Sequence, residues 1–269
     1  MVKDQFSVPT LLGLGALAQA GLIILLPARW ALVPVAVYIL GTIASTTIQT
    51  VIPSRNGFAT DVNPGRTSAQ LPNASYDPSR PDERPLFGGT PAGEQIVCFH
   101  LGQRFNHPLG LLSPGAREMG QHVLRMHAAL DAEPERFGFL GRSSWKAAGR
   151  ASHNTLLTVF YFRSVEGLHA FAHHEVHRAA WDWYNRFLRE TGHTHLGIFH
   201  ETFLAARGRW EAIYDNMPPT LLGAANVGVT NEGTGEGEFV LPLVDADTAQ
   251  LRSLYGRMGR TKGGFQLEA

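Results

Sequence analysis

Two long stretches without a charged residue open the chain and limit what its first 52 residues can fold into. Residues 8–26, "VPTLLGLGALAQAGLIILL", form a run of 19, and residues 30–52, "WALVPVAVYILGTIASTTIQTVI", form a run of 23. As helices, each would be roughly 28 Å long or longer, about the thickness of the hydrocarbon core of a bilayer. Residues 1–52 are therefore predicted to be a membrane-associated helical hairpin. A cleaved signal peptide and a pair of buried core helices are the alternatives.

Basic residues flank this hairpin on both sides. Lys3 precedes the first run, and Arg55 and Arg66 follow the second. Under the positive-inside rule these charges place both ends of the hairpin in the cytosol, and Trp30 at the turn suits a membrane interface. The sequence thus predicts a membrane location with a cytosolic globular part, whether the hairpin spans the bilayer or only dips into it.

The rest of the composition excludes several classes of protein. Lys and Arg total 23, and so do Asp and Glu, whereas nucleic-acid-binding proteins usually show a basic excess. The single cysteine, Cys98, rules out an intrachain disulfide and a cysteine-based zinc cluster. The chain contains neither a Walker loop nor a GxSxG elbow, and the glycines of "FGFLGRSSW" lack the spacing and context of dinucleotide binding.

Composition and periodicity divide the remainder of the chain into three parts. Residues 53–93 are rich in Pro, Gly, Ser, Asp and Asn and are expected to be an irregular linker. Residues 94–225 alternate between strand and helix patterns, and residues 226–269 are a C-terminal tail with a glycine-rich stretch and a modest amphipathic segment. The expected strands are 95–105, 137–145, 154–164, 195–205 and 209–214, and the expected helices are 113–131 and 164–189.

This order reads strand-helix-strand twice, followed by a strand that returns as a hairpin. Two split βαβ units of this kind build an antiparallel ferredoxin-like sheet with both helices on one face. We therefore predict an α+β fold, a ferredoxin-like domain over residues 94–225, preceded by the N-terminal hydrophobic helical hairpin.

The second expected helix carries an unusual set of histidines in "FAHHEVHRAAWDWYNRF", residues 171–187. His173 and His177 are one helical turn apart, a spacing that can chelate zinc. However, no His-Glu-x-x-His arrangement is present and spacing fixes no third ligand, so we predict no metal site. The histidines either pack at the helix edge, or His177 transfers protons. The apolar stripe expected to pack on the sheet is Leu168, Ala172, Val176, Ala179, Trp183 and Phe187.

The following strand holds His200 and Glu201 side by side in "GIFHETF". Neighbouring strand residues point to opposite faces, so these two side chains are not expected to enter one cavity. An inward imidazole could exchange protons near neutral pH, although half-buried packing is an equally simple interpretation. Tyr214 and Asn216 follow in "WEAIYDN", where they either act on a substrate or pack at a strand end.

Three motifs, "YFRSVEGLHAFAHHEVHRAAWDWYN", "GIFHETF" and "WEAIYDNMPPTLLG", resemble the fungal branch of the antibiotic biosynthesis monooxygenase-like proteins. This is the group of a fumagillin-pathway tailoring monooxygenase, and the resemblance covers roughly residues 90–225. It implies a homodimeric α+β barrel that modifies a natural product of secondary metabolism in a hydrophobic pocket between sheet and helices. It also implies oxygen chemistry without a cofactor, in which an electron-rich substrate is deprotonated and reacts with oxygen directly.

From these observations we expect a membrane-attached monooxygenase acting on a polyketide- or terpenoid-type intermediate. His177 or His200 would be the general base, and Tyr214 and Asn216 would orient or hydrogen-bond the developing oxyanion. The side chains expected to line the substrate pocket are Trp181, Glu201, Phe160 and Phe162.

Three alternatives remain open at this point. One is a haem enzyme of the same fold, similar to the aldoxime dehydratases, with a histidine as axial ligand. Another is a cofactor-free cyclase or isomerase. The third is a non-catalytic, membrane-bound protein that binds apolar intermediates, which would consume no oxygen and tolerate histidine substitutions.

Overall fold

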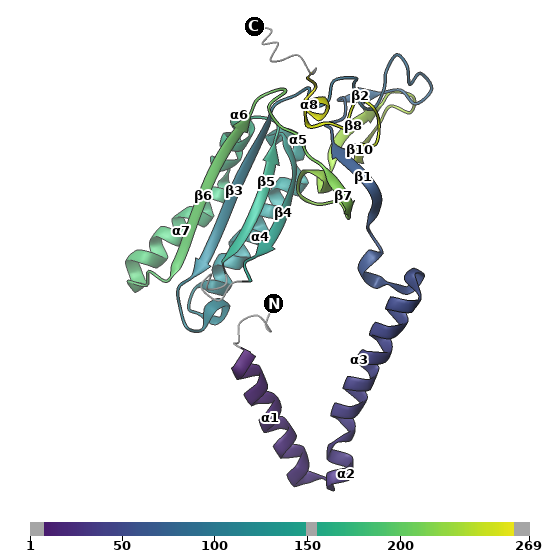
Figure 1. Cartoon of the computed structure of the whole chain (residues 1–269). Helices are drawn as coiled ribbons and strands as arrows, with labels where there is room; N and C mark the ends of the chain where they lie inside the picture. Colours follow the sequence, from purple (N-terminus) through teal and green to yellow (C-terminus); the bar gives the residue numbers. More distant parts are fainter. Residues whose placement is uncertain (1–7, 149–154, 261–269) are drawn as a thin grey trace. The chain divides into compact units, whose positions relative to one another are not determined.

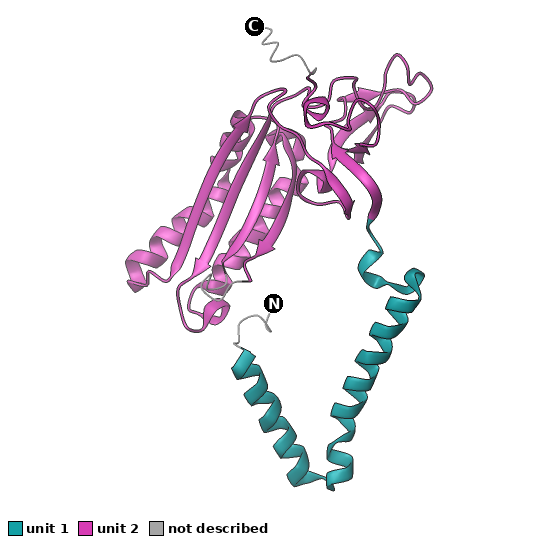
Figure 2. Ribbon diagram, in the orientation of Figure 1, with its two compact units in different colours: residues 1–62 teal, residues 63–269 magenta. Residues whose placement is uncertain are grey.

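The computed structural model describes residues 8–148 and 155–260, and the chain divides into two compact units, Met1–Val62 and Asn63–Ala269 (Figures 1 and 2). The first unit contains α1 (Val8–Leu25), α2 (Ala28–Ala31), α3 (Val33–Val51) and two 3₁₀ turns, Pro53–Arg55 and Gly57–Ala59. The elements of the second unit are β1 (Asn63–Ala69), β2 (Ser75–Tyr76), β3 (Ile96–Phe105), a 3₁₀ turn (Gly110–Leu112), α4 (Ala116–Ala132), α5 (Pro134–Phe137), β4 (Phe139–Lys146), β5 (Leu156–Phe162), α6 (Val165–Ala172), α7 (Glu175–Thr191), β6 (Leu196–Ala205), β7 (Tyr214–Met217), a 3₁₀ turn (Leu221–Ala224), β8 (Val227–Asn231), β9 (Glu236–Val240), β10 (Leu243–Asp245) and α8 (Leu254–Arg257).

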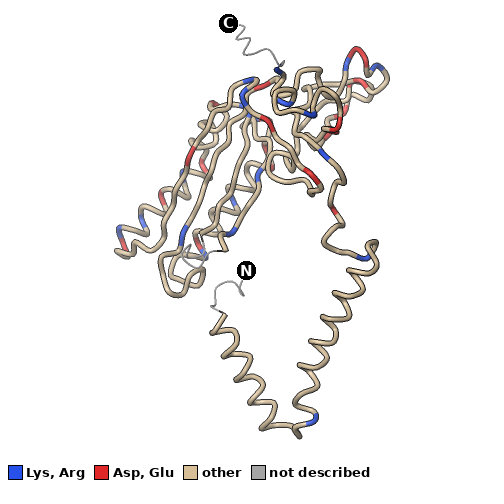
Figure 3. Tube along the Cα trace, in the orientation of Figure 1, with Lys and Arg blue, Asp and Glu red and all other residues tan. Residues whose placement is uncertain are grey.

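The first unit is a pair of apolar helices joined by the short helix α2. The stretches Val8–Leu25 and Ala28–Val51 are long and apolar enough to cross a membrane, with mean hydropathies of 1.9 and 1.8. Arg29 is the only charged residue in the sequence of these two stretches, and Figure 3 shows blue at the turn between the two long helices. The Gln19 side chain donates a hydrogen bond to the Ala31 carbonyl (3.1 Å), which ties α1 to α2. The length and the helical form that the sequence predicts are confirmed.

The main sheet of the second unit has the strand order β4-β5-β3-β6, and each neighbouring pair is antiparallel. This is the order that two split βαβ units produce, so the predicted ferredoxin-like fold is confirmed. Helices α4, α6 and α7 cover one face, called here the helix face (Figure 1). The other face is called the open face.

An aromatic core fills the space between the helices and the sheet. Phe160 and Phe162 of β5 are almost fully buried there, against Met126 and Leu130 of α4 and Leu168 of α6. The apolar residues of α4 belong to this core or to the neighbouring one around Phe105, namely Met119, Val123, Met126, Ala129 and Leu130. That helix starts three residues later than the sequence suggests, because Gly115 precedes it in the left-handed conformation (φ 77°).

The long helix predicted over residues 164–189 is two helices, and this prediction is corrected. Helix α6 ends at Ala172, and His174 has an extended backbone before α7 begins at Glu175. The His174 ring lies 5.4 Å from Phe137, between ring centroids, a contact that holds the junction. Because the break changes the helical phase, the buried stripe of α7 passes through Ala180, and Ala179 is exposed.

The strand expected over residues 209–214, returning as a hairpin beside β6, is not formed: residues 209–213 are irregular, and β7 begins at Tyr214 and joins another sheet. Strand β7 pairs with β1, which also pairs with β10, and a third sheet has the order β2-β8-β9. Both small sheets use residues that the sequence analysis assigned to the linker and to the tail. The Trp210 side chain, in the segment between β6 and β7, is buried in the core, and its indole N–H donates to the Glu94 carbonyl (2.7 Å), which fixes the course of the chain after the turn that follows β6.

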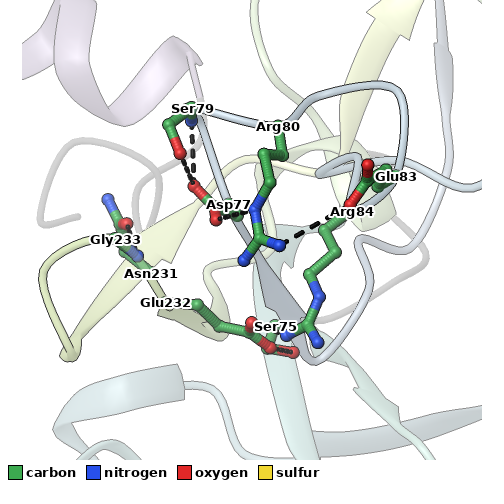
Figure 4. Close-up of polar contacts among 9 residues, drawn as sticks. All are labelled: Ser75, Asp77, Ser79, Arg80, Glu83, Arg84, Asn231, Glu232 and Gly233. Carbon is green, nitrogen blue, oxygen red and sulfur yellow. Dashed lines mark hydrogen bonds and ion pairs between the residues drawn. The ribbon is translucent and has the colours of Figure 1, made fainter.

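Polar contacts hold the supposed linker against the C-terminal part (Figure 4). Asp77 accepts hydrogen bonds from the Ser79 hydroxyl (2.6 Å) and backbone N–H, and Arg80 pairs with it at 2.9 Å. These contacts lower the pKa of Asp77 to about 2. Arg84 forms an ion pair with Glu232 beside β8. Residues 63–93 are thus a folded part of the second unit, contrary to the expectation of an irregular linker over 53–93.

The contact between α6 and α5 depends on a glycine. A Cβ atom on Gly167 would lie 2.1 Å from the Phe137 carbonyl oxygen, a backbone atom that cannot rotate away. We expect Gly167→Ala to lower the free energy of unfolding by about 1–3 kcal/mol, as overpacking does. Gly120→Ala is the matched control, since nothing lies within 4 Å of its Cβ position in α4. It should raise stability by roughly 0.5–1 kcal/mol in urea unfolding, and equal effects of the two changes would contradict the argument.

Candidate active site

The pairing of β3 with β6 decides which face each candidate side chain occupies. His200 lies opposite Leu101 and Glu201 lies opposite His100. Leu101 packs into the core under the helices, so His200 is on the helix face and Glu201 on the open face. The predicted separation of these neighbours is confirmed, and the two faces of β6 carry two different polar clusters.

On the helix face the structure brings His177 and His200 into electrostatic range of each other. The His200 ring lies 5.7 Å from Phe99, between centroids, and the His177 ring lies 6.0 Å from Phe171. Burial lowers the pKa of His177, and the nearby charges of His173 and His200 lower it further. A half-buried, neutral imidazole beside aromatic rings can accept a proton from a weakly acidic substrate carbon.

The remaining helix-face candidates do not form the expected pocket. Phe160 and Phe162 are 4% and 1% exposed and are part of the packed core. Trp181 points outward from α7, with 54% of its surface exposed, and its ring lies 6.0 Å from Tyr184. A substrate that enters between helices and sheet would have to displace core side chains, so the aromatic residue available to it beside His200 is the partly buried Phe99.

Tyr214 and Asn216 lie away from His200, on the strand that joined the other sheet. The Tyr214 hydroxyl accepts a hydrogen bond from the Gly223 N–H (2.9 Å), and burial raises its pKa. Asn216 has a left-handed backbone (φ 51°), and its side-chain oxygen accepts a hydrogen bond from the Gly65 N–H (3.1 Å). Both therefore have structural contacts, and the structure does not bring them together with the two histidines.

Two of the better-defined cavities in the described part of the chain are lined by none of the predicted site residues. One, of about 400 Å³, lies along β1 and β10. The other, of about 520 Å³, lies at the outer edge of β4, where Arg142 forms a double hydrogen bond with Asp131 (2.6 and 2.8 Å). Neither of these two cavities is lined by His177 or His200, the histidines that the haem alternative would use as axial ligands.

His127 of α4 is a candidate that sequence reasoning missed. Its ring lies 5.6 Å from Phe160 in the helix layer, and its Nε2 atom is buried with no hydrogen-bond partner among the described residues. Burial, then the charge of Arg142, lowers its pKa to about 4. The four-residue spacing from His127 to Asp131 is visible in the sequence, but the pairing of Asp131 with Arg142 needs the sheet.

Replacing His127 by leucine should change how stability depends on pH. Between pH 6.5 and about 4 the unfolded chain binds a proton at this position that the folded chain does not, so stability falls as pH drops through this window. His127→Leu removes this loss, which amounts to roughly 2–3 kcal/mol at pH 4. Urea unfolding at pH 7 and pH 4.5 measures it, with His193→Leu at an exposed histidine as the control. Parallel pH curves for His127→Leu and the unaltered chain would refute the assignment.

Metal ligation has no support in the described residues, among which no group of three or more His, Cys, Asp and Glu side chains could hold an ion.

On the open face, His100 and Cys98 were not singled out as site residues by sequence reasoning. Their two-residue spacing places them on one face of a strand, but only the register of β3 with β6 puts Glu201 beside them.

Known proteins share this architecture and much of the sequence. The family described as Monooxygenase af470-like matches residues 96–222. Monooxygenase af470 of Aspergillus fumigatus is 38% identical over 259 residues, which cover 96% of this chain and 90% of that protein.

Solved structures show more distant similarity. SnoaB, a cofactor-independent oxygenase from Streptomyces nogalater, is 12% identical with a TM-score of 0.29, over 40% of this chain and 90% of that one. A putative antibiotic biosynthesis monooxygenase from Caulobacter crescentus is 11% identical with a TM-score of 0.30, over 41% and 90% of the two chains. An aldoxime dehydratase, OxdRE, is 14% identical with a TM-score of 0.34, over 59% and 41%.

Proposed function

The chain belongs to the af470-like monooxygenase family, and from that premise we propose that it is a membrane-attached monooxygenase for a hydrophobic, electron-rich intermediate of polyketide or terpenoid type. The observation that carries the proposal is the 38% identity to a monooxygenase across 90% of that relative. The two apolar N-terminal helices support the membrane attachment, because an apolar intermediate partitions into the bilayer where the enzyme is held.

His200 is the proposed proton acceptor. It is exposed on the helix face next to Phe99, which offers an apolar surface for the substrate, and His177 is within electrostatic range of it. Removing a proton from an activated methylene group leaves a carbanion that can react with oxygen. Oxygen bonds to this carbon, and the proton held on His200 returns to the outer oxygen to give a hydroperoxide. The second C–H bond then breaks, its electron pair forms the carbonyl as the O–O bond breaks, and hydroxide leaves with that second proton as water. The substrate thus supplies all four electrons.

Oxygen labelling tests the reaction class. The full chain in detergent is supplied with ¹⁸O₂ and with two probes, a phenolic polyketide bearing an activated methylene group and a sesquiterpene. We expect oxygen uptake and one labelled oxygen atom in the polyketide product without an added reductant. An absorption spectrum with metal analysis accompanies the assay, since a Soret band or stoichiometric iron would overturn the cofactor-free proposal. Binding of the probes without oxygen uptake would instead favour a binding protein.

We propose further that the enzyme is a homodimer that pairs through one part of the open face, which leaves the row of Cys98, four residues along β3 from the contact, outside the interface. One row across this face is apolar, with Trp145 and Phe199 exposed at its two ends and Leu157 and Gly102 between them. An apolar sheet face of this kind is typically covered by a second chain. Trp145→Glu should therefore reduce the mass of the detergent-solubilised protein from two chains to one in light scattering. Lys146→Glu at the next position, on the other face, is the control, and an unchanged mass for Trp145→Glu would count against the dimer.

A further inference from the structure

The open face carries a thiol, an imidazole and a carboxylate in sequence, with the imidazole between the other two groups. Cys98 and His100 are two residues apart on β3, and the Cys98 Sγ lies 3.5 Å from the His100 Nε2. Glu201 lies directly opposite His100 on β6, with its carboxylate oxygen 3.7 Å from the His100 Nδ1. All three side chains are at least partly accessible, and the proposed oxygenation at His200 on the helix face does not use them.

The order of these groups fits a single direction of proton movement. With its proton on Nδ1, the imidazole points that N–H at Glu201 and leaves Nε2 free to accept the proton of the Cys98 thiol. Transfer of that proton gives a thiolate next to an imidazolium, and the carboxylate of Glu201 stabilises the imidazolium charge. This is the arrangement of nucleophile, base and orienting carboxylate that activates cysteine in enzymes.

An exposed aromatic ring flanks the thiol on one side and favours a flat ligand. Phe203, the neighbour of Cys98 on β6, is 51% exposed, and its ring lies 5.4 Å from His100, edge to face. Tyr161, the neighbour of Cys98 on β5, is buried in the core. Burial raises the pKa of the Cys98 thiol, so the sulfur is protonated and needs a base before it can attack. His100 is the base in hydrogen-bond reach.

We propose that Cys98, His100 and Glu201 form a second reactive site, at which the thiol adds to a conjugated carbonyl compound such as an enone or a quinone. The S–H bond breaks and its proton moves to His100 Nε2. The S–C bond forms at the β-carbon, and the electron pair of the C=C bond moves to the carbonyl oxygen. His100 then returns the proton to the α-carbon, so the addition is redox-neutral and needs no further reactant.

Alkylation by N-ethylmaleimide, itself a conjugated carbonyl compound, tests this site in the full-length protein in detergent. Because Cys98 is the only cysteine, the mass increase of the intact chain reports on this thiol alone. We expect His100→Ala to slow alkylation by roughly tenfold or more, the lower end of what a positioned base contributes. Added imidazole should restore part of the rate in His100→Ala, and Glu201→Gln should slow alkylation by a smaller factor.

Three controls separate chemistry from folding and accessibility. His193→Ala, at an exposed histidine at the start of the turn into β6, should leave the alkylation rate unchanged. In denaturant all variants should react at one common rate. Glu201→Gln, at a mostly exposed side chain, keeps the test valid if His100→Ala unfolds. Native rates that are equal in all variants, or a slow rate in His100→Ala that imidazole fails to raise, would overturn the proposal.

Discussion

His200→Ala is expected to lower kcat by about 10²- to 10⁴-fold, the usual contribution of a positioned proton acceptor. Its effect on stability should be small, within about 0.5 kcal/mol, because the side chain is exposed on the edge strand β6 and makes one ring contact, with Phe99. Initial rates of oxygen uptake and urea unfolding of the same preparation measure the two quantities. Loss of activity with unchanged stability identifies a chemical role.

His193→Ala, near the start of the same strand, is the matched exposed-histidine control and should keep full activity. Full activity in His200→Ala would remove that residue from the mechanism and leave His177 as the proton acceptor. The pH profile of kcat identifies His177 if that residue carries the reaction. Because burial lowers the pKa of His177, its imidazole stays neutral below pH 6.5, so activity carried by His177 would persist into that range and be lost as pH falls further.

Periodicity predicted the main sheet well because each of its elements has a clear local pattern. The strands 95–105, 137–145, 154–164 and 195–205 each agree with an observed strand to within two residues at either end. Long-range pairing was not predictable in the same way. In the sequence, the segment that follows β6 is the expected hairpin partner of that strand. In the structure, β7 pairs with β1, about 150 residues earlier, and no local sequence pattern predicts this pairing.

The candidate site shows the same division between local and long-range information. Alternation along β6 was enough to place His200 and Glu201 on opposite faces. The distances that matter chemically join different strands and helices, such as His100 to Glu201 and His177 to His200, and depend on register and packing. The break at His174 also escaped prediction, because an aromatic contact with Phe137 holds it and no proline or glycine marks it.

Paired arginines in the N-terminal helices are expected to release the enzyme from membranes. Leu17 and Leu40 lie near the middle of the two candidate spans, and both are more than 60% exposed within their unit. An arginine at the centre of a membrane helix costs roughly 2.5–3.5 kcal/mol, so Leu17→Arg with Leu40→Arg should weaken insertion by roughly 5–7 kcal/mol. We expect the doubly substituted chain to move from the carbonate-resistant membrane pellet to the supernatant.

Val51→Arg is the control for this loss, because it places the same charge at the end of α3, where a long side chain can reach the headgroups. It should remain in the pellet, and circular dichroism should show that the helical content of all variants is preserved. If the double variant stays in the pellet, the two helices are held by something other than the bilayer core. If the double variant and Val51→Arg are extracted equally, the hairpin lies at the membrane surface. Only release of the double variant alone supports two helices buried in the bilayer, where an enzyme can meet an apolar intermediate without drawing it through water.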